Sequence, residues 1–318
     1  MRILGIETSC DETAAAVVEN GKRILAHTVV SSLKQHRKFG GIIPEIASRR
    51  QLECIEPIVR TTLEKSACSL KKVDAIAVTT HPGLIGSLLV GTSFAQALSR
   101  TLKKPYIPVD HIQAHLYANC LYEKQPSAPY PRLPAIGLVV SGGHTSLFRI
   151  TDWQKPKLIG HTRDDAAGEA FDKVARILEL GYPGGPAIEK IARTAKVSQL
   201  AFKPAWLPGT LDFSFSGIKT AVLYHVREHK KITHAVKADI ARAFQESVVE
   251  VLVAKTLLAA EKYGCPTILV GGGVAANGFL RQVLLAKAQE RNCRVFFPPL
   301  SLCLDNAAMI AGLAYHLN

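Results

Sequence analysis

The sequence predicts an α/β protein whose parallel or mixed sheets are covered by helices on both faces. Short apolar runs typical of buried strands alternate with longer amphipathic stretches along most of the chain, which is the order expected of such sheets. A strand, a turn of small polar residues and a returning strand also occur twice, at 3–18 and at 135–150. Because 318 residues exceed the usual size of one core, we expect two related domains.

The first domain is expected over 1–125. It opens with the strand Ile3–Glu7, the polar turn Thr8–Thr13 and the returning strand Ala14–Val18. Small residues in such a turn let backbone amides approach a bound anion closely. The elements expected next alternate between helix and strand, with helices at 44–69 and 86–102 and strands at 73–78 and 106–109.

The second domain is expected over 135–318, after a linker at 126–134 that holds four prolines. It repeats the opening pattern with the strand Ala135–Val140, the glycine turn Ser141–Thr145 and the return Ser146–Ile150. Further helices are expected at 166–180, 237–263 and 275–290, with a buried strand at 266–270. The Gly- and Pro-rich turn 181–186 is not expected to serve packing, and the terminal helix is free to pack back on the first domain.

The composition is that of a folded intracellular protein. Hydrophobic residues make up 47% and charged residues 20%, which excludes a disordered chain. The net charge of +13 suits a polyanionic partner such as RNA, although a basic solvated surface explains it equally well. Seven cysteines without a C-x-x-C pair indicate reduced thiols. Because no signal peptide or long apolar stretch is found, we expect a cytoplasmic protein with no membrane partner.

Two histidines four residues apart form the sharpest local signal. His111 and His115 lie one helical turn apart in Asp110–His115, so both imidazoles can reach one metal ion. The alternative is a pair of structural histidines. A zinc peptidase of the H-E-x-x-H type needs glutamate directly after the first histidine, and Ile112 stands there. The pattern therefore predicts a metal site and disfavours a peptidase.

The glycine turn Gly271–Gly273 follows a strand and opens a helix. Such a turn can bind a nucleotide phosphate, although many glycine turns are only tight turns, and no G-x-G-x-x-G or P-loop motif is present. If phosphate approaches here, Gly272→Val is expected to weaken binding. Asp172, one turn into its helix, is suited to accept hydrogen bonds from hydroxyl groups. Asp305, just ahead of the last helix, would equally serve as a plain N-cap.

Taken together, several segments resemble one known family in order along the whole chain. They are Gly5–Thr13, Gly86–Gly91, Asp110–His115, Val140–Thr145, Gly168–Lys173, Phe213–Lys219, Gly271–Asn277 and Asp305–Ala308. The resemblance is to the TsaD/Kae/OSGEP family, the tRNA N6-adenosine threonylcarbamoyltransferases, in its bacterial form. Three positions depart from the family pattern, His81, Gln51 and Leu304, and Leu304 stands where it could alter hydrogen bonding at Asp305.

The resemblance implies the actin-like ATPase (sugar kinase/Hsp70) superfold, with two related domains around a central cleft. It implies one divalent metal per chain, with Fe²⁺ expected ahead of Zn²⁺, held by His111, His115 and Asp305. It also implies a substrate site composed of Val139, Val140, Ser141, Gly142, Gly143, Asp172, Gly185, Glu189 and Asn277.

The implied reaction passes a threonylcarbamoyl group from threonylcarbamoyl-AMP to the adenosine 3′ of the anticodon, in tRNAs that read codons starting with A. Implied partners are tRNA, a TsaB-like paralogue and a TsaE-like ATPase. No general base is identified, and Asp11 and Glu12 are weak candidates. Two alternatives are a catalytically silent nucleotide-binding scaffold of the same fold and a metallo-glycoprotease, the second disfavoured by Ile112.

Overall fold

A computed structural model describes residues 1–124, 130–195, 200–204, 206–228 and 232–318. The chain divides into two compact units. Unit 1 comprises Met1–Pro131, Asp152–Lys155 and Pro298–Asn318, and unit 2 comprises Arg132–Thr151 and Pro156–Phe297. The last segment of the chain, which the sequence analysis assigned to the second domain with freedom to pack back, thus belongs to the compact unit of the N-terminus.

Unit 1 is built on a five-stranded mixed sheet in the order β3-β2-β1-β4-β5. The strands are β1 (Arg2–Glu7), β2 (Glu12–Glu19), β3 (Arg23–Ser31), β4 (Ala75–His81) and β5 (Tyr106–Asp110). The first three form antiparallel pairs, whereas β4 pairs parallel with β1 and β5 parallel with β4. The carboxyl ends of β1, β4 and β5 therefore lie at the same edge of the sheet.

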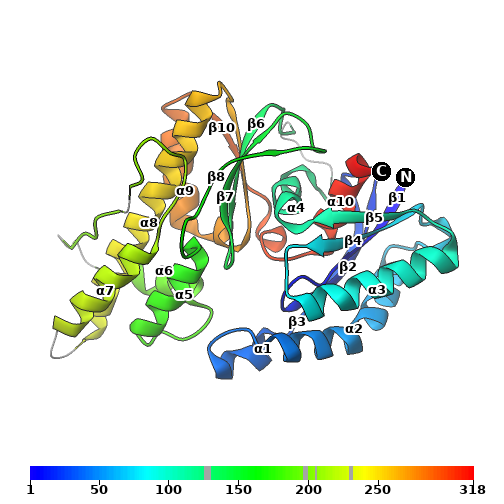
Figure 1. The fold of residues 1–318 in the computed structure, drawn as a ribbon, viewed down its shortest axis with the longest axis horizontal. Helices are drawn as coiled ribbons and strands as arrows, with labels where there is room; N and C mark the ends of the chain where they lie inside the picture. Colours follow the sequence, from blue (N-terminus) through cyan, green and yellow to red (C-terminus); the bar gives the residue numbers. More distant parts are fainter. Residues whose placement is uncertain (125–129, 196–199, 205, 229–231) are drawn as a thin grey trace. The chain divides into compact units, whose positions relative to one another are not determined.

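Helices cover both faces of this sheet, as Figure 1 shows for α2 and α3 on one side and α4 and α10 on the other. The helices are α1 (Leu33–His36), α2 (Pro44–Lys65), α3 (Ile85–Leu102), α4 (His111–Tyr117) and α10 (Ala307–Leu317), with 3₁₀ turns at Arg37–Phe39, Leu70–Lys72, Ala118–Cys120 and Leu300–Leu302. Alternation of side chains along β1 puts Leu4 and Ile6 into the core under α2 and α3, and Ile3 into the core under α4 and α10.

Unit 2 repeats this topology with a second five-stranded sheet, in the order β10-β9-β6-β7-β8. Its strands are β6 (Ala135–Val140), β7 (Thr145–Ile150), β8 (Lys157–His161), β9 (Thr267–Gly271) and β10 (Arg294–Phe296). Again three strands form antiparallel pairs, and two later strands add in parallel beside the first. The internal repeat suggested by the two strand–turn–strand segments is thereby confirmed at the level of the whole sheet.

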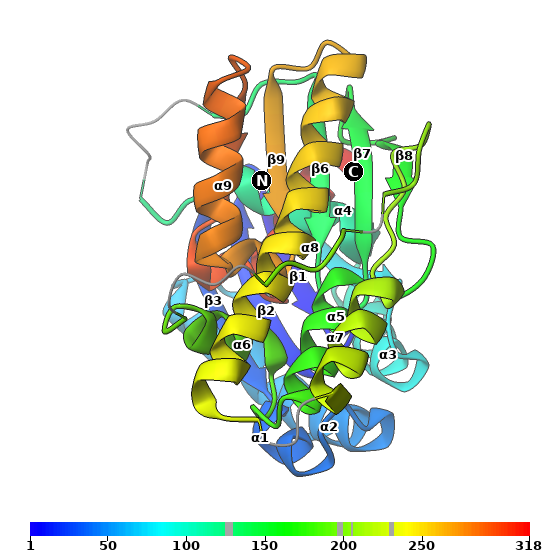
Figure 2. The same ribbon diagram turned by 90° about the vertical axis from the view of Figure 1, so that its left-hand side faces the viewer.

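The helices of unit 2 are α5 (Ala167–Ile177), α6 (Gly184–Ala192), α7 (Ser216–Glu228), α8 (His234–Lys262) and α9 (Gly278–Gln289), with a 3₁₀ turn at Gly273–Ala276. The long α8 packs on β6 and β9 and contacts α6, α7 and α9, and Figure 2 shows it running lengthwise beside α9. Among the described residues, no helix is both long and apolar enough to cross a membrane.

Two expectations about local structure in unit 2 are wrong. The segment 181–186 does serve packing, because α6 begins at Gly184 and an added Cβ there would lie 2.5 Å from Cα of Asp172. The helix expected to open directly from the glycine turn instead begins at Gly278, after the 3₁₀ turn. In both places the pattern was ambiguous because glycine is compatible with a turn and with close helix packing.

Candidate metal centre and substrate-binding turns

His111 and His115 lie on the short helix α4, which begins where β5 ends. Asp110 caps this helix, its side chain accepting a hydrogen bond from the amide of Gln113 at 2.9 Å. Both histidines are buried, and their ring centroids are 4.6 Å apart. The helical spacing predicted from the sequence therefore does bring the two imidazoles together.

Asp305 reaches the same place from the other end of the chain. The N-cap of α10 is Asn306, whose side chain accepts from the amide of Met309 at 3.0 Å, so Asp305 is not the plain N-cap that was the alternative. One carboxylate oxygen of Asp305 lies 3.4 Å from Nε2 of His111 and 3.2 Å from Nε2 of His115. One ligand atom from each of the three residues lies within 4.8 Å of the others.

The chemistry of this cluster fits a divalent ion such as Fe²⁺ or Zn²⁺. Two imidazole nitrogens and a carboxylate oxygen form a donor set typical of such metals. The ring nitrogens of His115 are buried, and neither makes a hydrogen bond to the described residues, although Nε2 lies 3.2 Å from the carboxylate of Asp305. Buried polar atoms without partners are costly, and a bound cation would satisfy Nε2.

The three groups also perturb one another electrostatically. Burial works to lower the pKa of His111, but the carboxylates of Asp305 and Glu7 outweigh it and hold that pKa well above its usual value. Burial lowers the pKa of His115. Burial disfavours the charged form of Asp305, yet His111 and His115 keep its pKa far below the usual range. The two histidines thus favour negative charge on the half-buried carboxylate of Asp305.

The turn that follows β1 carries Cys10 and Asp11, and Glu12 is the first residue of β2. Gln51 of α2 holds this turn, because its buried side-chain amide donates to the carbonyls of Cys10 at 2.9 Å and Glu12 at 3.1 Å. Burial, followed by the charges of Asp305 and Asp11, raises the pKa of Glu12 to about 10. Burial is also the main reason that the pKa of Cys10 is raised, with Asp305 second, so this thiol is a poor nucleophile.

The other two departures from the family pattern lie close to this centre. Nε2 of His81 lies 3.3 Å from a carboxylate oxygen of Asp110, the residue that caps α4. Leu304 is exposed, and its carbonyl accepts a hydrogen bond from the Asn306 side chain at 2.8 Å. Leu304 thus contributes its backbone to the turn that carries Asp305.

The predicted substrate residues of unit 2 begin at the end of β6. Val139 and Val140 are its last residues, and the turn that follows closes with the amide of Ser141 donating to the carbonyl of His144 at 2.8 Å. Gly142 and Gly143 have no atom within 4 Å of where a Cβ would lie. The backbone of this turn therefore borders open space.

The remaining predicted substrate residues lie on neighbouring helices. Asp172 of α5 accepts from the amide of Gly184 at 2.6 Å, and burial raises its pKa. Glu189 of α6 accepts from the amide of Gly278 at 3.0 Å. Asn277 caps α9 by accepting from Leu280 at 2.9 Å.

Contacts connect these helices to the glycine turns. The amide of Gly168, on α5, donates to the carbonyl of Ser141 at 3.1 Å, and Gly272 packs against the carbonyl of Val140. Asn277 also donates to Gln245 of α8 at 2.9 Å. Gly185, next to Gly184 at the start of α6, has open space where a Cβ would lie. The nine predicted residues thus belong to one connected region of unit 2.

Comparison with solved structures identifies the fold. Full-length HypF in its phosphate- and nucleotide-bound form has a TM-score of 0.64 and 15% identity, covering 99% of this chain and 46% of that one. Component A of (R)-2-hydroxyglutaryl-CoA dehydratase from Acidaminococcus fermentans has a TM-score of 0.57 and 13% identity, covering 99% of this chain and 98% of that one. The predicted actin-like superfold is confirmed.

Comparison of sequences identifies the family as well as the fold. A protein named tRNA N6-adenosine threonylcarbamoyltransferase from Symbiobacterium thermophilum is 51% identical over 315 residues, which cover 99% of this chain and 91% of the relative. One of the same name from Moorella thermoacetica is 50% identical over 316 residues, with the same two coverages. The family model TsaD, tRNA N6-adenosine threonylcarbamoyltransferase, matches residues 23–312. This chain therefore belongs to the TsaD family.

Proposed function

We propose that this chain transfers the threonylcarbamoyl group from threonylcarbamoyl-AMP to the N6 amine of the adenosine 3′ of the anticodon, in tRNAs that read codons starting with A. Membership of the family makes the chain an acyltransferase that modifies tRNA. The observation that carries the finer proposal is the cluster of His111, His115 and Asp305, whose ligand atoms lie within 4.8 Å of one another. A catalytically silent scaffold would have no need of this donor set.

We assign separate roles in this reaction to the residues of the two sites. His111, His115 and Asp305 would hold one divalent ion, which when bound supplies positive charge to polarise the carbamoyl carbonyl. The turn at Gly142 and Gly143 would let backbone amides approach the phosphate of the donor. Neighbouring Asp172 and Asn277 would orient the rest of the donor through hydrogen bonds. Asp11 and Glu12 stay our candidates for accepting the proton that the adenine amine loses, and Asp11 is favoured because the pKa of Glu12, raised to about 10, keeps that carboxyl protonated near neutral pH.

The proposal is tested by incubating the metal-loaded chain with tRNA and threonylcarbamoyl-AMP. We expect threonylcarbamoyl-adenosine and AMP in equal amounts, at a low rate for the chain alone and a high rate when a TsaB-like paralogue and a TsaE-like ATPase are added. Because the chain has a net charge of +13, we expect tRNA binding to depend largely on contacts with phosphates. If about six to ten phosphates are contacted, the affinity should fall by about 10³–10⁵ between about 50 and 200 mM salt. Multiple turnover by this chain alone, insensitive to salt, would contradict the expected dependence on partners and charge.

The helix pair α2 and α3 supports the proposed paralogue as a partner. Leu52 on α2 and Ile85 and Leu89 on α3 are exposed apolar side chains, with 70%, 86% and 63% of their surface accessible. The two helices are close at this point, because an added Cβ on Gly86 would lie 3.3 Å from Ser48, one turn before Leu52. Exposed apolar patches of this kind typically mark protein–protein contacts.

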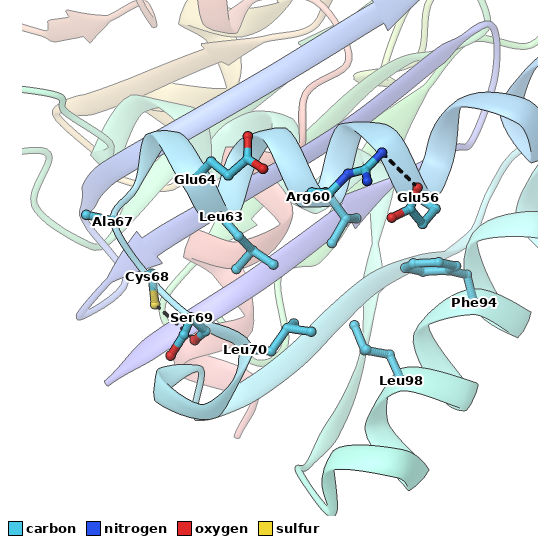
Figure 3. Close-up of a pocket in the computed structure, with 11 residues that line it drawn as sticks. Glu56, Arg60, Leu63, Glu64, Ala67, Cys68, Ser69, Leu70, Phe94 and Leu98 are labelled. Carbon is cyan, nitrogen blue, oxygen red and sulfur yellow. Dashed lines mark hydrogen bonds and ion pairs between the residues drawn. The ribbon is translucent and has the colours of Figure 1, made fainter.

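The same two helices, with the segment 67–70, line an open hollow of about 620 Å³ further along their length. Figure 3 shows Leu63 of α2 and Phe94 and Leu98 of α3 pointing toward it, with the ion pair of Glu56 and Arg60 at the rim. An apolar hollow with charged residues at its rim can bind an apolar side chain that protrudes from a partner protein. We therefore propose that the α2–α3 surface binds the paralogue.

This surface is tested by Leu89→Glu. A charge at the centre of an apolar interface should cost about 2 kcal/mol or more, which raises the dissociation constant for the paralogue about 30-fold. The measurement is calorimetric titration of the purified paralogue. Leu285→Glu, on a similarly exposed apolar side chain of α9 in unit 2, is the matched control and should bind as the wild type does. Equal affinity for both variants would exclude the α2–α3 surface.

A further inference from the structure

A fully buried carboxylate lies behind one of the two histidines of the candidate metal centre. Glu7 is the last residue of β1 and has no exposed surface. Its Oε2 atom is 3.0 Å from Nδ1 of His111 and accepts a hydrogen bond from Oγ1 of Thr79 at 2.5 Å. Its Oε1 atom accepts from the amide of Ser9. Each carboxylate oxygen thus has a partner, which is what a buried negative charge requires.

This arrangement determines which nitrogen of His111 is available to a ligand. A carboxylate accepts but does not donate, so Nδ1 of the neutral imidazole must carry the hydrogen that it shares with Glu7. The lone pair is then on Nε2, which faces the carboxylate of Asp305 at 3.4 Å. Without a metal, Nε2 and the carboxylate can share a proton, which a bound cation would replace. The hydrogen bond to Glu7 therefore prepares His111 to donate to a metal ion from Nε2.

His115 offers a comparison within the same cluster. Its Nε2 faces the same carboxylate at 3.2 Å, but its Nδ1 makes no hydrogen bond to the described residues, so no second residue selects the tautomer of this ring. Among the described residues, the two atoms that contact Nδ1 of His111 in hydrogen-bonding range are Oε2 of Glu7 at 3.0 Å and Oγ of Ser9 at 3.3 Å. A serine hydroxyl both donates and accepts, so it does not select a tautomer. Selection depends on Glu7.

We propose that Glu7 is the positioning residue of the metal centre, and that it holds His111 in the tautomer and orientation that bind a divalent cation through Nε2. The proposal rests on the proposed metal centre and adds a residue to it. Carboxylates that hydrogen-bond to a ligating histidine typically change metal affinity by about 10- to 100-fold when they are replaced. Glu7 acts through His111 and does not itself reach the cation.

The experiment measures Zn²⁺ affinity of the metal-free full-length protein by competition with a chelating indicator. Glu7→Gln keeps the volume of the side chain but removes the charge, and we expect it to raise the dissociation constant for Zn²⁺ by about 10- to 100-fold. Glu7→Asp keeps the charge but shortens the reach by one methylene, and we expect a loss here too. Ser9→Ala removes the other contact at Nδ1 and is the matched control, for which we expect the affinity of the wild type.

Thermal unfolding of each metal-free variant separates an effect on the fold from an effect on the metal. If Glu7→Gln does not fold, Thr79→Val removes the hydrogen bond to Oε2 and takes its place, with a smaller loss of affinity expected. If the folded Glu7 variants, or Thr79→Val, bind Zn²⁺ as tightly as the wild type does, the proposed role of Glu7 is wrong. The proposed metal centre is not affected by that result. If Glu7→Asp keeps the wild-type affinity for Zn²⁺ while Glu7→Gln loses it, the charge of residue 7 matters but its position does not. That result also contradicts a positioning role for Glu7. Failure of the wild type to bind Zn²⁺ would instead overturn the metal centre itself.

Discussion

Replacing His111 and His115 together by alanine is expected to abolish metal binding and to lower the rate of threonylcarbamoyl transfer by about 10³-fold or more. The rate estimate follows from the several kcal/mol of transition-state stabilisation that a bound cation supplies, at tenfold for about every 1.4 kcal/mol. The double variant removes two of the three clustered donors, and a lone carboxylate at Asp305 cannot retain a divalent ion at useful affinity. One ion per chain is expected in the wild type.

Metal content of the purified proteins, measured by mass spectrometry, checks this prediction. The fold should survive, because the core under α4 and α10 contains many apolar side chains besides these two rings. His316→Ala is a suitable control, since His316 lies in the same unit and contacts Tyr117 at 2.9 Å but is not in the cluster. It should keep its metal. Full metal stoichiometry in a folded double variant would mean that the ion binds elsewhere.

Gly272→Val is expected to destabilise unit 2 by several kcal/mol. Gly272 has a φ of +93°, and an added Cβ would lie 2.4 Å from the carbonyl oxygen of Val140. A β-branched residue is strained in that conformation, and the clash with backbone cannot be relieved by a side-chain rotation. The sequence analysis expected this substitution to weaken ligand binding directly. The structure corrects that expectation, because the substitution should distort the turn even when no ligand is present.

Gly185→Ala is the variant that does test the ligand. Gly185 has open space where its Cβ would lie, and alanine is a better helix former than glycine at the start of α6. We expect the variant to unfold at or above the temperature of the wild type and to bind threonylcarbamoyl-AMP more weakly, because the new methyl group occupies the space left for it. Calorimetric titration with threonylcarbamoyl-AMP measures the affinity of both variants, and thermal unfolding measures their stability. Wild-type stability of Gly272→Val, or wild-type affinity of Gly185→Ala, would contradict the respective half of this prediction.

Several features of the protein could be predicted from the sequence because they depend on neighbours along the chain. Strand β6 and its turn are predicted by an apolar run followed by Ser141–Thr145, and the structure has the strand at Ala135–Val140. The approach of His111 to His115 follows from helical spacing alone. The family resemblance extended this to Asp305 and to the substrate residues, because it connects motifs that lie far apart. Local patterns and recognised motifs thus indicated the fold class and the candidate site.

Tertiary structure alone decided the pairings between distant residues. Glu7 and His111 are 104 positions apart, and nothing in either segment shows that the end of β1 lies beside the start of α4; parallel pairing of β1, β4 and β5 places both at one sheet edge. Pro298–Asn318 likewise packs with the N-terminal unit, although an apolar helix such as α10 has no periodicity that specifies which sheet it covers. Tertiary structure also decides why a side chain is expected to be tolerated at Gly185 and not at Gly272. Both are glycines beside a turn, and only the packing of backbone around each one determines whether its hydrogen faces a neighbouring carbonyl or open space.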